Sequence, residues 1–242
     1  MNNEEPGSLL FTHYQLAQKP LGRFLLLLHV QTQRLRAEWL AHGTAALKRT
    51  LDIVVSLAAL ILLSPLFGLI ALAVWIEDGG PIFFTQIRVG QFGSEFKMYK
   101  IRSMCLDAEQ RLKELLAKNQ HKEGVTFKLK DDPRITRVGK WLRKFSFDEL
   151  PQLYNVLIGD MSLVGPRPPV PREVAKYSLE HRRRLAIRPG ITCFWQISGR
   201  SEIDFSGQVQ LDVNYIESQT LWTDLVILAR TVPAVLSGKG AC

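Results

Sequence analysis

An uncharged apolar segment is the strongest constraint on how this chain can fold. The residues from Ile53 to Ile76 include no charged side chain, and Glu77 follows them directly. An α-helix rises about 1.5 Å per residue, so a helix of this length would reach about 36 Å. That exceeds the hydrocarbon core of a bilayer, which is about 30 Å thick. Length alone therefore permits one membrane crossing.

Ser64 and Pro65, at the midpoint of this segment, oppose a straight crossing. Proline has no amide hydrogen and clashes with the carbonyl four residues earlier, so it kinks or breaks a helix. The Ser64 hydroxyl can hydrogen-bond to a carbonyl freed in this way. Each half of the segment is then about one leaflet long. We therefore expect a break at Ser64 and Pro65.

Basic residues lie on both sides of the apolar segment. Lys48 and Arg49 precede it, and further Lys and Arg residues follow it from Arg88 onward. Because positive residues favour the cytoplasmic side, one crossing cannot satisfy both ends. The pattern favours a re-entrant hairpin in the membrane, with a kinked span as the alternative.

The rest of the chain predicts an α+β protein that is predominantly helical. We expect an N-terminal extension over residues 1–47, the re-entrant membrane helix over 48–80 and a small cytoplasmic catalytic domain with interfacial helices over 81–242. In the extension, residues 21–47 predict a helix that either packs on the domain or lies in the membrane interface. In the domain, "IFFTQIRVG" and "EFKMYKIRSM" predict two short strands joined by a turn at Gln91–Ser94. The segment after the second strand, beginning at Cys105, has helical spacing of leucines.

Charge and cysteine content narrow the function without fixing it. The chain has 31 Lys and Arg against 23 Asp and Glu, a net charge of +8. Such a surplus suits nucleic acid, anionic lipid or phosphorylated substrates. The three cysteines form no CxxC pair, and no His/Cys cluster has zinc spacing. The basic stretch "EHRRRLAIR" has no interleaved aromatic residues, so we expect no nucleic-acid partner.

Two adjacent carboxylates, Asp148 and Glu149, stand in the densest group of candidate residues. Pro151 is tolerated only in a first helical turn, so a helix should begin close to Asp148. The positive end of that helix and the neighbouring cations favour the ionised form of both carboxylates. An ionised carboxylate can act as a nucleophile or as a ligand for a hard metal ion. The alternative is structural, because Ser146 and Glu149 fit a capping box.

Several cations could bind phosphate beside this pair. Arg167 stands between two prolines that restrict its backbone, and a stiffly held guanidinium suits bidentate phosphate contacts. Lys100 and Arg102 point to one face if their segment is a strand. The further candidates are Arg134, Arg137, Arg143 and Arg200. For any one arginine alone, a solvated surface position is the usual alternative.

Six motifs of this sequence resemble those of a known family. They are "KRTLDIVVSLAALILLSP", "GPIFFTQIRVG", "FKMYKIRSM", "DDPRITRVGKWLRK", "DELPQLYNVLIGDMSLVGPRP" and "RPGIT-FWQISGR". In order and spacing they are similar to those of the bacterial polyprenyl-phosphate sugar-1-phosphate transferases, also called monotopic phosphoglycosyl transferases. The resemblance runs from about Lys48 to Ala241. Cys193 stands where the family pattern has glycine, which affects the local geometry and the sugar specificity to be expected.

The resemblance implies an activity and roles for particular residues. The family transfers a sugar 1-phosphate from a nucleotide diphosphosugar to a polyprenyl phosphate at the cytoplasmic face of the bacterial inner membrane. Asp148 would be the nucleophile that forms a phosphosugar–enzyme intermediate, and Glu149 would help to hold Mg²⁺. Ser64 and Pro65 would form the break of the re-entrant helix. A UDP-hexose donor is favoured only by similarity to exopolysaccharide-type members, and the oligomeric state stays open. The competing class is a non-enzymatic basic scaffold that binds anionic membrane lipids.

Overall fold

The chain divides into two units, and the boundary along the sequence lies between Lys48 and Arg49. The structure is a computed structural model that describes residues 20–38, 43–115, 132–199 and 203–237. In the first unit, helix α2 (Pro20–Glu38) has exposed apolar side chains, among them Leu21, Phe24 and Leu27. Of the helix expected over residues 21–47, α2 covers the part up to Glu38 and a second helix begins at Thr44, while residues 39–42 lie outside the described residues.

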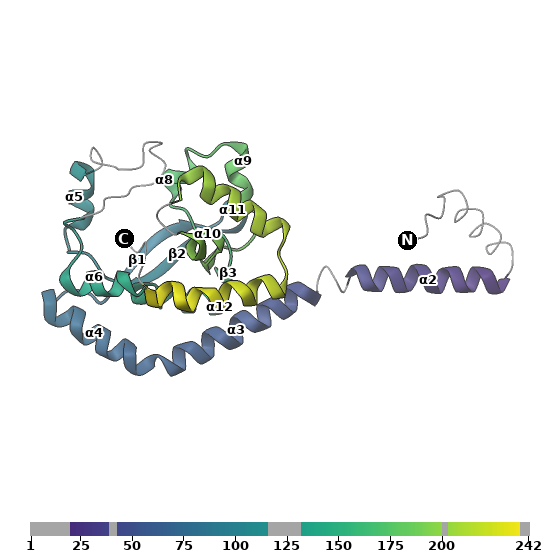
Figure 1. The fold of residues 1–242 in the computed structure, drawn as a ribbon, viewed down its shortest axis with the longest axis horizontal. Coiled ribbons are helices and arrows are strands. Elements are labelled where there is room, and N and C mark those ends of the chain that lie inside the picture. Colours follow the sequence, from purple (N-terminus) through teal and green to yellow (C-terminus); the bar gives the residue numbers. More distant parts are fainter. Residues whose placement is uncertain (1–19, 39–42, 116–131, 200–202, 238–242) are drawn as a thin grey trace. The chain divides into compact units, whose positions relative to one another are not determined.

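The apolar segment forms two helices that meet at a sharp bend (Figure 1). Helix α3 (Thr44–Leu62) and helix α4 (Ser64–Asp78) are bent by 60° relative to each other. Pro65 lies in the first turn of α4, where its missing amide leaves the carbonyl of Ile61 without its usual donor. The Ser64 hydroxyl donates to that same carbonyl at 2.8 Å. The break expected at Ser64 and Pro65 is confirmed.

Among the described helices, the bent pair is the one candidate for a membrane crossing. Neither α3 nor α4 alone combines the length and the apolar character needed for a crossing, whereas the two together do. In α3, polar side chains are buried and apolar side chains are exposed. Asp52 and Ser56 are buried against the domain, while Ile61 and Leu62 are 67% and 79% exposed.

The part of the second unit that follows the bent pair contains two small sheets. Strands β1 (Phe83–Val89) and β2 (Glu95–Ile101) pair antiparallel, and the 3₁₀ turn η2 (Gln91–Gly93) connects them, as predicted. Strands β3 (Ser162–Val164) and β4 (Gly190–Thr192) form a short parallel pair. Figure 1 shows the β1–β2 hairpin in the middle of the domain, with the bent pair along one side.

Short helices supply most of the domain, so the expected predominantly helical α+β class is confirmed. They are α5 (Ala108–Leu115), α6 (Arg137–Lys144), α7 (Gln152–Ile158), α8 (Pro171–Val174), α9 (Leu179–Arg182), α10 (Phe194–Ser198), α11 (Phe205–Glu217) and α12 (Leu221–Ser237), with 3₁₀ turns η4 (Phe147–Glu149) and η5 (Arg183–Leu185). The main core joins β2, α7, β3, α11 and α12 through side chains that include Met98, Val156, Leu163, Tyr215 and Ile227. This core fixes the two segments that carry the site described next.

Candidate active site

The two adjacent carboxylates lie on the 3₁₀ turn η4, directly before α7. Helix α7 begins at Gln152 rather than at Asp148, and Pro151 is the residue that precedes it. The capping-box alternative is wrong. Ser146 has a left-handed backbone with φ of 55°, and its side chain makes no capping hydrogen bond. The carboxylate of Glu149 is therefore not used to cap a helix.

Three cations surround Glu149. Lys100 Nζ donates to Glu149 Oε1 at 2.7 Å, and Arg167 Nη1 reaches the same oxygen at 3.5 Å. Lys100 Nζ also lies 4.0 Å from Asp148 Oδ2. The third cation, Arg88, lines the same small hollow as Lys100, Glu149 and Arg167. We call Arg88, Lys100 and Arg167 the cation cluster.

Arg88 belongs to the site although sequence reasoning counted it only as a charge beside the membrane segment. Its Nη1 donates to the carbonyl of Pro168 at 2.9 Å, and its Nη2 donates to Gln86 Oε1 at 2.7 Å. The first contact fixes the backbone next to Arg167. Burial, together with repulsion from Arg167, lowers the pKa of Arg88 to about 10. The alternation of Gln86 and Arg88 along a strand was the available signal.

Asn155 brings Lys100 to the carboxylates. Its Oδ1 accepts from the Tyr99 amide at 3.0 Å, and its Nδ2 donates to the Lys97 carbonyl at 2.7 Å. These bonds join α7 to β2 next to Lys100. Asn155 was not among the predicted residues, because nothing near it in the sequence reveals a partner on a distant strand.

The two carboxylates differ in acidity. Burial alone would raise the pKa of Glu149, but attraction to Lys100 and Arg167 outweighs it and lowers the pKa to about 2. For Asp148, burial dominates and raises the pKa, and the neighbouring charge of Glu149 acts in the same direction while Lys100 opposes both. The expectation that the surroundings favour ionisation therefore holds for Glu149 and is wrong for Asp148.

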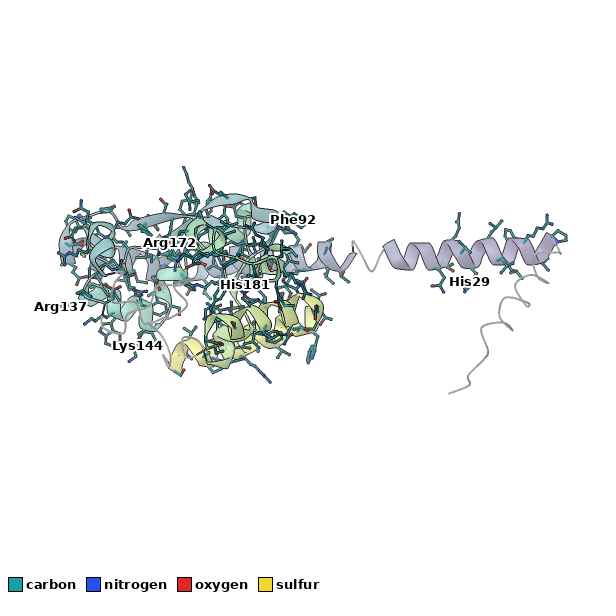
Figure 2. The ribbon with its side chains drawn as sticks, turned by 90° about the horizontal axis from the view of Figure 1, so that it is seen from above. His29, Phe92, Arg137, Lys144, Arg172 and His181 are labelled. Carbon is teal, nitrogen blue, oxygen red and sulfur yellow. The ribbon has the colours of Figure 1, made fainter. Side chains whose placement is uncertain are left out.

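The remaining predicted cations are spread over different positions. Arg143, in the last turn of α6, lines the same cavity as Asp148 and Glu149. Arg102 and Arg134 also line it, but they pair with Asp78 and Asp132. Arg137 is exposed at the edge of the domain and does not line the cavity (Figure 2). Arg200 lies outside the described residues.

The site opens into a cavity of about 800 Å³. Its lining includes apolar side chains such as Phe83 and Phe84 of β1, and it also includes Tyr177, Trp195 and Gln208. A cavity of this size can hold a ligand as large as a sugar nucleotide. Its lining combines apolar, charged and polar side chains.

Cys193 fits its position without strain. Its backbone is extended, with φ of −154°, so no glycine is required there. The side chain is fully buried, and its thiol donates to Gln196 Oε1 at 3.3 Å. The departure from the family pattern therefore leaves the local backbone intact.

The carboxylates suit Mg²⁺ held jointly by protein and substrate. No group of three or more His, Cys, Asp or Glu side chains with metal-binding geometry occurs within the described ranges. Mg²⁺ is commonly held by only one or two carboxylates together with substrate phosphates. Glu149 is a strongly ionised oxygen donor, and Lys100 and Arg167 both engage its Oε1. The donor chemistry of Glu149, with Asp148 beside it, therefore fits Mg²⁺.

Comparisons with known proteins place the chain in a family. The model of a family described as bacterial sugar transferase matches residues 43–238. The exopolysaccharide production protein ExoY of Sinorhizobium fredii is 43% identical over 80% of this chain and 87% of its own length. The galactosyl transferase CpsE of Streptococcus agalactiae is 56% identical over 68% of this chain and 37% of its own length. The undecaprenyl-phosphate galactose phosphotransferase of Salmonella typhimurium is 43% identical over 90% of this chain and 46% of its own length.

The chain thus spans less than half the length of two of these relatives and most of the third. The family match covers the bent helix pair, both carboxylates and the cation cluster. The chain belongs to the bacterial sugar transferase family.

Proposed function

We propose that this protein transfers a sugar 1-phosphate from a nucleotide diphosphosugar to polyprenyl phosphate. The observation that carries the proposal is the buried carboxylate pair enclosed by the cation cluster. Relatives named as undecaprenyl-phosphate galactose and glucose phosphotransferases support the acceptor, and one named as a UDP-galactose-lipid carrier transferase favours a UDP-hexose donor. Assembly of exopolysaccharide is the corresponding role, in line with the name of the ExoY relative.

The charge of the site favours a phosphorylated ligand. Arg88, Lys100 and Arg167 supply three positive charges around two carboxylates, and burial makes uncompensated charge costly. Arg143, also in the lining of the cavity, adds a further cation. A diphosphate provides the missing negative charge, and the guanidinium groups can bind it through paired hydrogen bonds.

Asp148 is the nucleophile in this proposal. Its Oδ attacks the phosphorus that carries the sugar, and the bond from that phosphorus to the bridging oxygen breaks. Nucleoside monophosphate leaves, and the sugar phosphate stays on the enzyme as an aspartyl phosphodiester. An oxygen of the polyprenyl phosphate then attacks the same phosphorus and releases Asp148. A covalent intermediate lets one pocket serve a soluble donor and a lipid acceptor in turn.

Glu149 and the cations do not react but prepare the site. Glu149 holds Lys100 next to Asp148, and the cation cluster offsets charge on the leaving phosphate. Mg²⁺ held by Glu149 would supply further stabilisation of phosphate charge when bound.

The bent pair serves as a re-entrant membrane anchor in this proposal. Its exposed apolar side chains, such as Ile61, Leu62 and Leu69, face away from the domain, whereas its charged residues attach to it. An anchor of this kind keeps the cavity at the depth of lipid headgroups on the cytoplasmic face. There it can meet both a nucleotide sugar and a polyprenyl phosphate.

Release of nucleoside monophosphate tests this function. The full chain in detergent or liposomes, given UDP-galactose or UDP-glucose with undecaprenyl phosphate, should release UMP, and radiolabelled sugar should become protein-bound when acceptor is absent. Asp148→Asn should abolish both signals. Glu217→Gln, a change of an exposed carboxylate, is the control. A protein that binds anionic lipid but releases no nucleotide from any nucleotide sugar would instead be a scaffold.

A further inference from the structure

The cavity has a polar wall whose one charged side chain is paired with a buried carboxylate outside the wall. It consists of Tyr177, Arg184, Trp195 and Gln208, which follow one another from the end of α8 to α11. We call these four residues the neutral wall. None of them belongs to the cation cluster, and the mechanism proposed above does not use them.

Arg184 is neutralised from behind by Asp212. Its Nε donates to Asp212 Oδ2 at 2.7 Å, and both residues are buried. Its Nη1 also donates to the Tyr177 hydroxyl at 3.3 Å. The pair therefore brings hydrogen-bonding groups to the cavity without the positive charge that would select a phosphate.

Trp195 and Gln208 add a donor and an acceptor. The indole N–H of Trp195 is buried and has no acceptor among the described residues. Gln208 Nε2 donates to the Ile203 carbonyl at 3.0 Å, which leaves its carbonyl oxygen to accept from a ligand. A buried donor without a partner is costly, so a ligand oxygen at Trp195 would be stabilising. Because the Trp195 ring is only 8% exposed, it offers little face on which a nucleobase could stack.

The neutral wall lies next to the cation cluster through the β3–β4 pair. Val164 is opposite Thr192, so the segment that leads to Arg167 runs beside the segment that leads to Trp195. Gly165 N donates to the Thr192 carbonyl at 3.0 Å, which continues this pairing past the end of β3. A ligand whose phosphate meets Arg167 can therefore place its next group against the neutral wall.

We propose that the neutral wall binds the hydroxyl groups of the hexose in the nucleotide-sugar donor, a role that rests on the proposed function. A hexose has no charge and offers several hydroxyls that both donate and accept. The mixture of donors and acceptors on Tyr177, Arg184, Trp195 and Gln208 matches that chemistry. Trp195 is then a residue that determines sugar affinity, while the cation cluster binds the diphosphate.

Trp195→Phe tests the inference, because it removes the N–H and keeps an aromatic ring. Calorimetry on the full chain in detergent should compare UDP-galactose, UDP-glucose and UDP. Loss of one hydrogen bond should weaken binding of the better UDP-hexose by about fivefold to thirtyfold and leave UDP binding unchanged. Gln208→Met should give the same pattern. Trp222→Phe on α12, where the side chain is 73% exposed, should change neither affinity.

Two results would overturn the assignment. An equal loss of affinity for UDP and UDP-hexose would place the nucleotide against the wall, and unchanged binding of both would remove the wall from the donor site. UDP binding by the variants shows that they are folded. Failure of the proposed function looks different: the wild-type chain would bind UDP-hexose yet release no UMP with undecaprenyl phosphate, and the binding comparison would still decide the role of the wall.

Discussion

Asp148 and Glu149 are neighbours in the chain, yet their carboxylates should titrate in different pH ranges. The pKa of Glu149 is lowered to about 2, so this group stays ionised at neutral and mildly acidic pH. The pKa of Asp148 is raised by burial. If Asp148 is the nucleophile, it must be deprotonated to attack. Activity should therefore be present above the pKa of Asp148 and be lost as the pH falls through it, at a pH above that of an ordinary aspartate.

Arg143→Gln should move this acid limb to higher pH. Arg143 lowers the pKa of Asp148 by electrostatic attraction, so loss of its charge raises that pKa further. The measurement is UMP release against pH, with kcat/KM reporting the free enzyme. Arg183→Gln, which changes an exposed arginine, is the control. A limb that stays in place or moves to lower pH would contradict the assignment of Asp148 as the titrating group.

Arg167→Lys should lower kcat/KM about tenfold to a hundredfold, by the loss of a charged hydrogen bond to phosphate. Lysine keeps the charge but loses the planar pair of donors. The backbone at Arg167 is held in one place by the prolines on either side and by the hydrogen bond from Arg88 to the Pro168 carbonyl. The backbone therefore cannot easily move to bring the lysine side chain into the position of the guanidinium. The control is Arg182→Lys on α9. Full activity in Arg167→Lys would show that charge alone is required.

At this scale the sequence predicts residues whose signal is local and misses those whose partners are distant. Asp148, Glu149 and Arg167 stand in motifs that can be read directly. Asn155 acts on Tyr99 and Lys97 of another element, so its role depends on the fold. The same limitation applies to Arg102, which the sequence places among the phosphate-binding candidates and the structure pairs with an acidic side chain. Its partner Asp78 lies at the end of α4, which only the structure brings near.

Among the elements, α3 has a second role besides that of an apolar helix. Arg49 donates to the carbonyls of Val156 and Leu157 at 2.6 and 2.8 Å and so satisfies the end of α7. Asp52 accepts from the Leu163 amide at 3.0 Å on β3. Helix α3 therefore holds the segment between Glu149 and Arg167 at two points. From sequence, Arg49 was interpreted only as a charge that sets membrane orientation.

Asp212→Asn should lower the free energy of unfolding by about 3–5 kcal/mol, because it leaves Arg184 buried without a counter-charge where η5 packs on α11. Asp212 and Arg184 are 0% and 5% exposed. Chemical or thermal unfolding of the purified chain measures the loss. The double variant Asp212→Asn/Arg184→Met should recover most of it, since no unpaired charge remains. A double variant as unstable as the single one would show that the buried pair has a different role.

At the scale of the whole molecule, within the unit that begins at Arg49, both limbs of the bent pair are attached to one domain. Arg49 and Asp52 attach α3, and Glu77 of α4 accepts from the Arg137 and Val138 amides of α6 at 2.7 and 3.2 Å. One domain cannot lie on both sides of a membrane, so these contacts favour re-entry. Limbs of 19 and 15 residues are about 28 and 22 Å long. With a bend of 60° shared equally, the apex would reach about 11–14 Å, which is within one leaflet.

We expect this attachment to keep both limbs on one side of the membrane when the proline is lost. Pro65→Leu restores an amide that can bond to Ile61, and so favours a straighter helix. A straight helix would have to separate either Asp52 or Glu77 from the domain, and that loss opposes the change. Single cysteines at Thr44 and Ser94, in a background without the three native cysteines, report the side of each limb through an impermeant maleimide on intact vesicles. We expect both to be labelled from one side in the wild-type background and in Pro65→Leu.

Adding Asp52→Leu and Glu77→Leu to Pro65→Leu should give partial labelling from opposite sides. These changes remove contacts that hold the limbs to one domain and also lengthen the apolar segment at each end. Asp52→Leu with Glu77→Leu in the presence of Pro65 is the matched control and should keep both labels on one side. Labels on opposite sides in the wild-type background would mean that the pair spans the membrane as a kinked helix. Opposite-side labelling in Pro65→Leu alone would mean that the proline, rather than the attachment to the domain, maintains the re-entrant form.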